Sequence, residues 1–457
     1  MGTHFRSLTI EDIRRETADC VSVAFGIPPE WRDEFRFRQG QNITVRMTVG
    51  GAEVRRSYSI CSSPEEGELR IAVKKVEGGI FSTYANEALQ KGHALEVLPP
   101  SGKFYTELHP ANRKHYLAFA AGSGITPVIS LVKTTLAVEP GSRFTLVYGN
   151  RNRLSIIFRE ELEALKDRYI DRLALHHILS REEMDVPVYQ GRIDVRKCEE
   201  LCERLIDLRS ADEVFLCGPE QMIFSLKDWL EGRGVERKRV HFELFHTLGE
   251  VSAKLVERGG KITTGKESET GAGGGGFGAT EGGVAGGPGG PGGPGGPGGP
   301  GGASGVGATA GREGVLGVVA GGGVGAAGAA GSGGKGDVGG AIGGVGGVDA
   351  KGGMPTRAAA GPPAVSEVTV RLDGISHRFA LPYDGASVLE AALMEGIDLP
   401  YACKGGVCCT CRAKLVEGKV EMDHNYALEA DELEAGYVLT CQSHPRSDKV
   451  VVDFDTK

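Results

Sequence analysis

The sequence lacks long apolar runs, and no stretch approaches the roughly 20 apolar residues that a membrane-spanning helix requires. The first residues lack the charged-then-apolar pattern of a secretory signal. Position 6 is Arg, where an N-myristoylation pattern has Ser or Thr. The formal net charge of −8 provides no basic surface for nucleic acid. We therefore expect a soluble, cytoplasmic protein that acts neither at a membrane nor on nucleic acid.

Cysteine is scarce outside one region, and the ten cysteines do not form the evenly spaced ladder of a disulfide-rich protein. Three of them have the spacing C-x4-C-x2-C, and a fourth follows downstream. This is the plant-type pattern for a [2Fe–2S] cluster, whose two irons require four soft thiolates. Gly405 and Gly406 let a short loop pass around such a cluster without side-chain clashes. The predicted ligands are Cys403, Cys408, Cys411 and Cys441.

A four-cysteine zinc site is the alternative for this region. Structural zinc sites usually have two C-x2-4-C pairs, whereas here three cysteines crowd one loop and the fourth stands alone. The spacing therefore favours the iron–sulfur cluster. Cys409 is a spare, expected to be a small packed residue rather than a ligand. A thiolate-bound iron cluster also indicates a reducing compartment.

Most of the 72 glycines lie in one block that separates the chain into modules. Residues 258–364 are mostly Gly, Ala, Val and Pro and have few of the aromatic and large branched side chains that offset the entropy cost of ordering. The Gly-Gly-Pro triplets are too short and irregular a run for collagen. We predict a disordered linker that permits contact between its neighbours without fixing their orientation.

Residues 1–103 have short alternating runs between Gly, Pro and Asp or Asn turns, which is typical of an antiparallel β-barrel. Two motifs follow strand-like runs: R-S-Y-S at 56–59 and E-G-G-I-F-S-T at 77–83. A guanidinium, hydroxyls and the first N–H groups of a helix bind a pyrophosphate, and the ring of Tyr58 can stack on a flat cofactor. Either motif alone is weak, since such short patterns occur by chance.

Residues 104–257 alternate between strand and helix patterns. The apolar run 116–121 suits a buried parallel strand, and it leads through G-S-G-I-T-P at 122–127 into a helix. Strand, glycine-rich turn and helix place a dinucleotide diphosphate on a helix N-terminus. Further strands are predicted at 144–149, 175–179, 213–217 and 240–245. Polar or glycine motifs at successive strand ends predict a nucleotide-binding α/β domain with a parallel sheet, although Cys217 alone suits a buried small residue.

Residues 365–457 are expected to form a small α+β roll of the ubiquitin-like, β-grasp type. Two strand patterns make a hairpin, and a helix follows with Ser387 as its N-cap. This module has 16 acidic and 9 basic residues, a net charge of −7. Such acidity suits docking onto a basic partner face, and a merely solvated surface explains it equally well.

With these motifs in hand, the first two modules resemble the ferredoxin–NADP reductase superfamily. The resemblance rests on R-x-Y-S, G-x-x-S, G-S-G-I-T-P, C-G-P at 217–219 and E-x-F at 243–245. The last module resembles a plant-type ferredoxin. The order of the three modules is closely similar to that in the family of reductase components that serve phenylacetyl-CoA epoxidases. The glycine-rich block is far longer than the joint of that family.

The resemblance implies an FAD site in the barrel module. The residues implied to bind FAD are Arg56, Tyr58, Ser59, Gly79, Phe81, Ser82 and Phe245. Ser59 would lie near N5 of the flavin and Tyr58 against its ring. The carboxylate of Glu243 and the ring of Phe245 match groups that close the flavin site in relatives. Ser59, Glu243 and Cys217 form the implied catalytic group.

The resemblance also implies a nicotinamide nucleotide in the second module, with Cys217 beside the nicotinamide. The residues implied to bind this nucleotide are Gly122, Gly124, Thr126, Pro127, Arg151, Ser180, Arg181, Gly218 and Pro219. Ser180 and Arg181 match the pair that reads the 2′-phosphate of NADP, and Arg151 and Arg153 add positive charge. NADPH is therefore favoured, although NADH-dependent relatives also have Arg nearby.

The implied activity is that of an oxidoreductase that passes electrons from NADPH through FAD and the [2Fe–2S] cluster to a di-iron oxygenase. The oxygenase would epoxidise the ring of phenylacetyl-CoA. A reductase for another multicomponent oxygenase is the main rival, because no residue of this chain meets the organic substrate. A non-catalytic tethered ferredoxin and a zinc-stabilised interaction module are further rivals. Intact Arg56, Ser59, Cys217 and Glu243 argue against a non-catalytic tethered ferredoxin.

Overall fold

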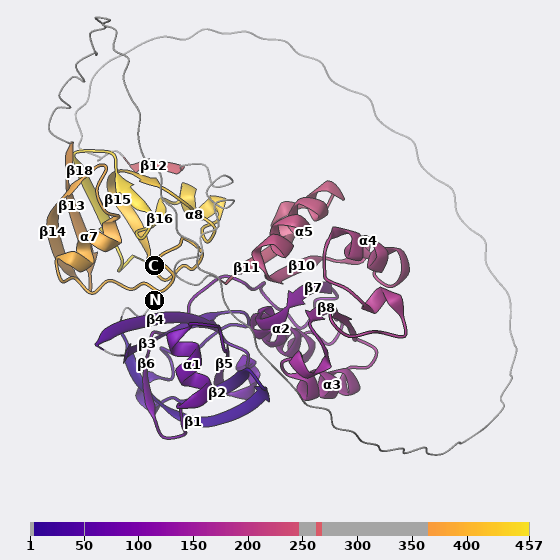
Figure 1. The fold of residues 1–457 in the computed structure, drawn as a ribbon. Coiled ribbons are helices and arrows are strands. Elements are labelled where there is room, and N and C mark those ends of the chain that lie inside the picture. Colours follow the sequence, from indigo (N-terminus) through magenta and orange to yellow (C-terminus); the bar gives the residue numbers. More distant parts are fainter. Residues whose placement is uncertain (1–3, 50, 246–261, 267–363, 457) are drawn as a thin grey trace, which may run out of the picture. The chain divides into compact units, whose positions relative to one another are not determined.

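The computed structural model describes residues 4–49, 51–245, 262–266 and 364–456. These described residues belong to one compact unit, in which three modules follow the order of the sequence (Figure 1). Apart from 262–266 and 364, the predicted linker 258–364 lies outside the described residues.

The first module is an antiparallel sheet with one helix. Its sheet has the order β4-β3-β6-β1-β2-β5. A bridge between Ile60 and Ile71, just after β4 and within β5, joins the two ends as the predicted barrel requires. The elements are β1 (Arg6–Thr17), β2 (Cys20–Gly26), β3 (Asn42–Val49), β4 (Ala52–Ser59), β5 (Leu69–Lys74), α1 (Ile80–Glu87) and β6 (Ala94–Val97).

The second module is a five-stranded parallel sheet of order β11-β10-β7-β8-β9. The apolar run at 116–121 lies in a strand that is buried along almost its whole length, as predicted. Apolar clusters cover both faces of the sheet. Its elements are β7 (His115–Ala121), α2 (Ile125–Val138), β8 (Arg143–Asn150), α3 (Arg159–Arg168), β9 (Leu173–Leu179), α4 (Val195–Arg204), β10 (Glu213–Gly218), α5 (Glu220–Gly232) and β11 (Val240–Leu244).

The third module is the predicted α+β roll, with a sheet of order β12-β15-β18-β13-β14. The hydroxyl of Ser387 accepts a hydrogen bond from the N–H of Glu390, which confirms the predicted N-cap. Its elements are β12 (Ile262–Lys266), β13 (Val365–Leu372), β14 (Ile375–Pro382), α7 (Val388–Met394), β15 (Arg412–Met422), α8 (Ala430–Glu434), β16 (Tyr437–Leu439), β17 (Ser443–Pro445) and β18 (Lys449–Asp453).

Strand β12 differs from the sequence-based expectation, since it lies within the predicted linker 258–364. Its residues pair antiparallel with β15 from Ile262–Met422 to Lys266–Gly418. The run Ile-Thr-Thr at 262–264 has the β-branched composition that strands favour. The low-complexity composition of the surrounding block masked this short signal.

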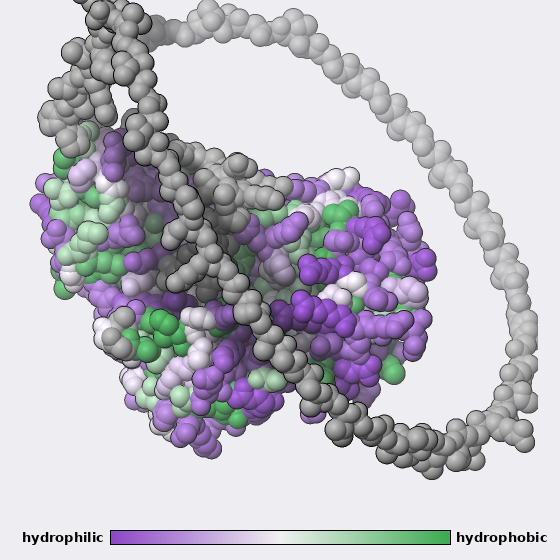
Figure 2. All heavy atoms as spheres, viewed as in Figure 1, coloured by the Kyte–Doolittle hydropathy of each residue, from purple (hydrophilic) through white to green (hydrophobic). Residues whose placement is uncertain are grey.

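Hydrophilic side chains predominate on the visible surface around α3 and α4 (Figure 2). Helix α3 accordingly buries Leu162 and carries charged residues along most of its length. Within the described ranges, no helix combines the length and the apolar character needed to cross a bilayer.

Candidate active site

The three residues predicted to be catalytic meet at the junction of the first two modules. Ser59 ends β4, and its hydroxyl donates a 3.0 Å hydrogen bond to the carboxylate of Glu243. Cys217 and Glu243 are directly paired in the parallel register of β10 and β11. Ligands of α/β proteins bind where parallel strands end, and both residues lie at that edge of the sheet. The fold therefore unites three positions that are far apart in the sequence.

Burial controls the protonation of Glu243 and Cys217. Loss of water around Glu243 raises the pKa of its carboxyl to about 7; the Cys408 sulfur adds to the effect, and hydrogen bonds from Ser59 and Asn42 oppose it. Glu243 is half-buried at the surface of the sheet edge, but surrounding protein atoms exclude most water from its carboxyl. Burial also raises the pKa of the Cys217 thiol well above its usual value. Cys217 is therefore a neutral contact at pH 7 rather than a thiolate nucleophile.

The raised pKa of Glu243 predicts a pH dependence of stability. The folded protein binds this proton more tightly than the unfolded chain, so the stabilisation is complete below about pH 4.5 and is lost as the pH rises through about 7. Glu243→Gln is neutral at every pH. We expect the melting temperature of this variant to fall less than that of the wild type between about pH 5 and 8. Thermal denaturation of the holoprotein across this range measures the difference.

A matched control for this experiment is Glu30→Gln, because Glu30 is exposed on the first module. Its pH dependence should equal that of the wild type. Equal slopes for Glu243→Gln and the wild type would contradict the assigned protonation.

The candidate flavin site lies at the end of β4 and the start of α1. The guanidinium of Arg56 donates to the carbonyl of Arg55 at 2.7 Å, and its remaining N–H groups make no ion pair within the described part of the chain. The rings of Tyr58 and Phe81 lie 5.3 Å apart. Helix α1 begins after Gly79, and its first N–H groups have no intrahelical acceptor. These features fit a pyrophosphate and a stacked ring system.

The hydroxyl of Ser82 has a local structural role. It accepts a hydrogen bond from the N–H of Val76 at 3.1 Å and donates to the carbonyl of Gly79 at 3.3 Å. The side chain therefore closes the turn that leads into α1. Its predicted contact with a phosphate stays a prediction. Phe245 lies at the end of β11 and is exposed.

The candidate nucleotide site is the turn between β7 and α2. Gly122 has a φ of +55°, and a Cβ there would have nothing within 4 Å, so open space faces the turn. The hydroxyl of Tyr148 fixes this turn by donating to the Gly122 carbonyl at 2.9 Å. A Cβ on Gly124 would lie only 2.1 Å from the carbonyl oxygen of Cys217. The hydroxyl of Thr126 donates to the Ser123 carbonyl at 3.0 Å and so supports the turn.

The predicted 2′-phosphate site lies at the ends of β8 and β9. The N–H of Arg181 donates to the carbonyl of Arg151 at 2.7 Å, which brings the two exposed residues together. Within the described ranges, neither side chain has an ion pair. Arg153 is different, because its guanidinium and its N–H both bind Glu182. Arg151 and Arg181 are thus available to an anion, while Arg153 is neutralised.

The four predicted cluster ligands converge in the third module. The thiol of Cys408 lies 3.2 Å from the sulfur of Cys403. Hydrogen bonding to Cys441 is the main cause that raises the pKa of Cys411, so these two sulfurs are also neighbours. The N–H of Gly405 donates to the Cys403 sulfur at 3.3 Å. Two pairs of sulfurs suit two irons that each take two thiolates.

Cys409, the fifth cysteine of this region, is not one of the predicted ligands. Cys409 is buried, and its thiol donates to the carbonyl of Ala427 at 3.3 Å. This supports its expected role as a packed residue.

Sequence reasoning missed Asn42 as a member of the Glu243 site. Asn42 is buried at the start of β3, opposite Ser59 in the antiparallel register. Its hydrogen bond to Glu243 stabilises the ionised carboxylate. The antiparallel pairing of β3 with β4 could have identified Asn42, because the residue opposite Ser59 must lie close to the groups that Ser59 contacts.

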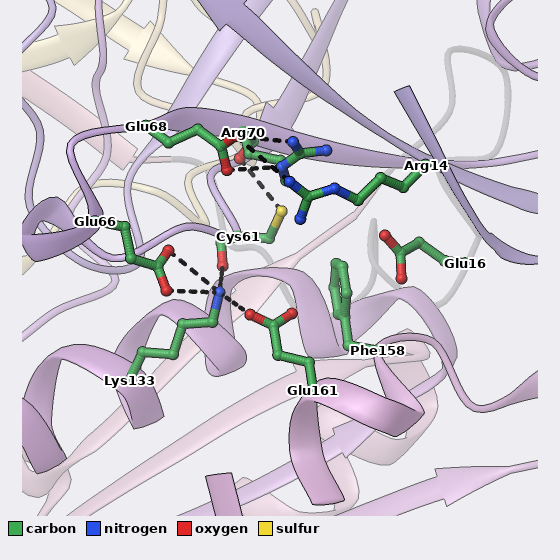
Figure 3. Close-up of a pocket in the computed structure, with 9 residues that line it drawn as sticks. All are labelled: Arg14, Glu16, Cys61, Glu66, Glu68, Arg70, Lys133, Phe158 and Glu161. Atoms are coloured by element: carbon green, nitrogen blue, oxygen red, sulfur yellow. Dashed lines mark hydrogen bonds and ion pairs between the residues drawn. The ribbon is translucent and has the colours of Figure 1, made fainter. Parts of the chain in front are cut away.

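A separate cavity of about 290 Å³ lies between the barrel strands and helices α2 and α3 (Figure 3). In it, Lys133 reaches the carbonyl of Cys61 and the carboxylates of Glu66 and Glu161. Arg70 binds the carboxylate of Glu68. These charged groups pair with one another, so we interpret the cavity as part of the polar interface between the first two modules.

Comparisons with known proteins agree with the three-module architecture. Residues 7–105 match the oxidoreductase FAD-binding domain, residues 119–228 the oxidoreductase NAD-binding domain and residues 370–446 the 2Fe-2S iron-sulfur cluster binding domain. A crystal structure of an intact type IV self-sufficient cytochrome P450 monooxygenase matches 98% of this chain and 41% of its own, at 18% identity and a TM-score of 0.52. That likeness concerns the fold alone.

Full-length relatives belong to oxygenase systems. The chain is 37% identical over 455 residues to a subunit of 1,2-phenylacetyl-CoA epoxidase from Escherichia coli, covering 100% of this chain and 99% of the relative. It is 30% identical to the ferredoxin reductase component of 3-ketosteroid-9-alpha-monooxygenase from Rhodococcus rhodochrous, covering 99% and 98%. FAD, NAD(P)H and a [2Fe–2S] cluster are accordingly its cofactors. The chain belongs to the family of oxygenase reductase components that includes this 1,2-phenylacetyl-CoA epoxidase subunit.

Proposed function

We propose that this chain takes electrons from NADPH and delivers them to a di-iron oxygenase that epoxidises the ring of phenylacetyl-CoA. The 37% identity to the 1,2-phenylacetyl-CoA epoxidase subunit from Escherichia coli supports the identity of the partner. We also place the protein in the cytoplasm, because a thiolate-ligated cluster is maintained in a reducing compartment.

The observation that carries the proposal is the proximity of the predicted hydride-transfer group to the cluster loop. The carboxyl of Glu243 accepts the hydrogen bond of Ser59. Two residues before Ser59 on β4, the hydroxyl of Ser57 lies 3.1 Å from that of Thr44, which in turn lies 3.4 Å from the hydroxyl of Thr410 in the cluster loop. A flavin held between Tyr58 and Cys217 would therefore lie near the cluster. FAD, when bound, supplies the conversion of one hydride into two single electrons.

The protein's own residues bind, orient and exclude water in this proposal. Arg56 and the start of α1 hold the pyrophosphate of the flavin, and Tyr58 holds its ring. Cys217, neutral and buried, would pack against the nicotinamide. The hydroxyl of Ser59 donates its hydrogen bond to Glu243, and this pair would lie beside the flavin. No strong nucleophile is needed.

A visible spectrum of the purified holoprotein, titrated anaerobically with NADPH and then NADH, tests this function. Flavin bands that bleach first, followed by iron–sulfur bands, are the expected result. Absence of a flavin band would refute the reductase assignment. For the partner, the chain should replace its relative in the Escherichia coli epoxidase system and restore ring epoxidation; failure there with active reductase would favour another oxygenase.

The guanidiniums of Arg151 and Arg181, which have no ion pair with any residue that the structure describes, predict the nucleotide preference. Replacing Arg181 with Ala removes a charge-assisted bond to the 2′-phosphate, and each such bond contributes about 1.5–3 kcal/mol. We expect kcat/KM for NADPH to fall about 10-fold or more, with little change for NADH. Steady-state reduction of ferricyanide with each nucleotide measures this ratio.

Arg153→Gln is the matched control for nucleotide preference, because Arg153 is already paired with Glu182. Its NADPH-to-NADH ratio should stay close to that of the wild type. If Arg153→Gln shifts the ratio and Arg181→Ala does not, the assignment of the phosphate site is wrong.

A further inference from the structure

The hairpin of β3 and β4 presents two rows of side chains with different surroundings. Successive residues of a strand point to opposite faces. Arg56 and Tyr58, which are assigned to the flavin, belong to one row. The neighbouring row includes Ser59, which is assigned to the same site, and also Arg46 and Arg55, which are directly paired across the hairpin. The side chains of Arg46 and Arg55 meet the third module.

The contact is a charge cluster around Asp398. The guanidinium of Arg46 donates to the carboxylate of Asp398 at 3.0 Å, and Arg55 donates to its other oxygen. Arg55 also donates to the carbonyl of Leu399 at 3.1 Å. Arg46 is held in place by two further bonds to Glu96, of 3.0 and 2.9 Å. Arg46 is therefore oriented by its own module as well as by Asp398.

Burial makes Arg55 central to this contact. Its side chain is 3% exposed, although β4 is an edge strand of its sheet. The ring of Tyr401 covers the guanidinium carbon at 4.3 Å, and Glu53 binds its Nε at 2.7 Å. A buried cation is costly unless it is paired and hydrogen-bonded, so removing Asp398 would take away one of the two carboxylates that compensate Arg55. Asp398 is the one of the two that belongs to the third module.

Two more contacts lie beside the predicted cluster ligands. The hydroxyls of Thr44 and Thr410 are 3.4 Å apart, and Thr410 lies between Cys408 and Cys411 in the sequence. Lys103 of the first module binds Glu432 at 2.8 Å, and Glu432 is 4% exposed. Polar groups of the first module thus meet both the cluster loop and helix α8 of the third module.

We propose that Arg46, Arg55 and Asp398 form an electrostatic latch that holds the iron–sulfur module in the position where its cluster accepts electrons from the flavin. The proposal deepens the proposed function and rests on it. The latch residues are positioning residues, since they contact neither the nicotinamide nor the cluster ligands. The acidic third module finds its basic partner face within its own chain.

Asp398→Lys tests the latch in the full-length holoprotein. The Asp398 side chain is 59% exposed, so the reversal of charge should leave the module folded. After anaerobic mixing with NADPH in a stopped-flow instrument, flavin bleaching should keep its wild-type rate. Subsequent bleaching of the cluster should slow about 10-fold or more, because like charges then face each other at the contact. High salt should slow this step in the wild type more than in the variant.

Asp384→Lys is the matched control, because it changes the same charge on the same module and has no hydrogen bond or ion pair to the first module among the described residues. Its cluster should bleach at a rate within about twofold of the wild type. If Asp398→Lys lowers cluster content, Arg46→Gln provides the second test, since it leaves the third module unchanged. If the variants keep their cofactors and their clusters bleach at the wild-type rate, the latch proposal is wrong. Failure of NADPH to bleach the flavin of the wild type would instead refute the proposed function and the latch with it.

Discussion

Replacing Cys411 with Ser is expected to leave the purified protein without its iron–sulfur absorption, while its flavin still bleaches with NADPH. Cys411 is 1% exposed and lies in the apolar core of the third module beside Cys441. A serine hydroxyl is a harder and far less acidic ligand than a thiol, so it binds iron poorly at this position. The first two modules contribute no predicted cluster ligand and should keep their function.

The loss should be large for any acceptor that takes electrons from the cluster. Loss of an outer-shell partner of a metal ligand costs about 10–100-fold, and removal of a ligand itself should cost more. NADPH-dependent reduction of a one-electron protein acceptor measures delivery, and iron content with the visible spectrum measures the cluster. Ferricyanide reduction reports the flavin step separately.

Cys409→Ser provides a matched control for Cys411→Ser within the same loop. The Cys409 thiol donates to the carbonyl of Ala427 at 3.3 Å, and a serine hydroxyl can donate to the same oxygen. We expect this variant to retain its cluster. A Cys411→Ser protein with a full cluster, or a Cys409→Ser protein without one, would contradict the ligand assignment.

Local patterns predicted most of the fold because each of them depends on a short stretch of chain. The apolar run at 116–121 marked a buried strand, and Ser387 marked the start of a helix. The spacing of Cys403, Cys408 and Cys411 predicted ligands that the structure brings together with the distant Cys441. Such local patterns predict structure well because backbone geometry and ligand spacing depend on only a few neighbouring residues.

Contacts between distant segments could not be predicted in the same way. Arg55 and Asp398 are separated by 343 residues, and nothing around either of them indicates the other. Arg55 directly precedes the predicted flavin residue Arg56, and only the alternation of β4 gives the two different surroundings. Ser82 matched a phosphate motif, yet its hydroxyl is used by neighbouring backbone groups. Tertiary packing decided these roles.

Replacing Gly124 with Ala is expected to disrupt the nucleotide half of the active site. The added Cβ would lie 2.1 Å from the carbonyl oxygen and 2.4 Å from the carbonyl carbon of Cys217, and 2.8 Å from the nitrogen of Gly218. These are backbone atoms of β10, which its neighbours hold on both sides within the parallel sheet. Either α2 or the end of β10 must move. Overpacking of this kind costs about 1–3 kcal/mol, and occasionally more.

The displacement should affect function as well as stability, because the end of β10 carries Cys217 and pairs with Glu243. We expect Gly124→Ala to lower the melting temperature and to slow flavin bleaching by NADPH, while ferredoxin-module absorption is retained. Gly232→Ala is the matched control: Gly232 ends α5, a Cβ there meets nothing within 4 Å, and helical Ala is favoured over Gly. Wild-type stability and flavin bleaching in Gly124→Ala would show that α2 can yield without moving Cys217, and the turn would then not be the rigid support of the nucleotide site.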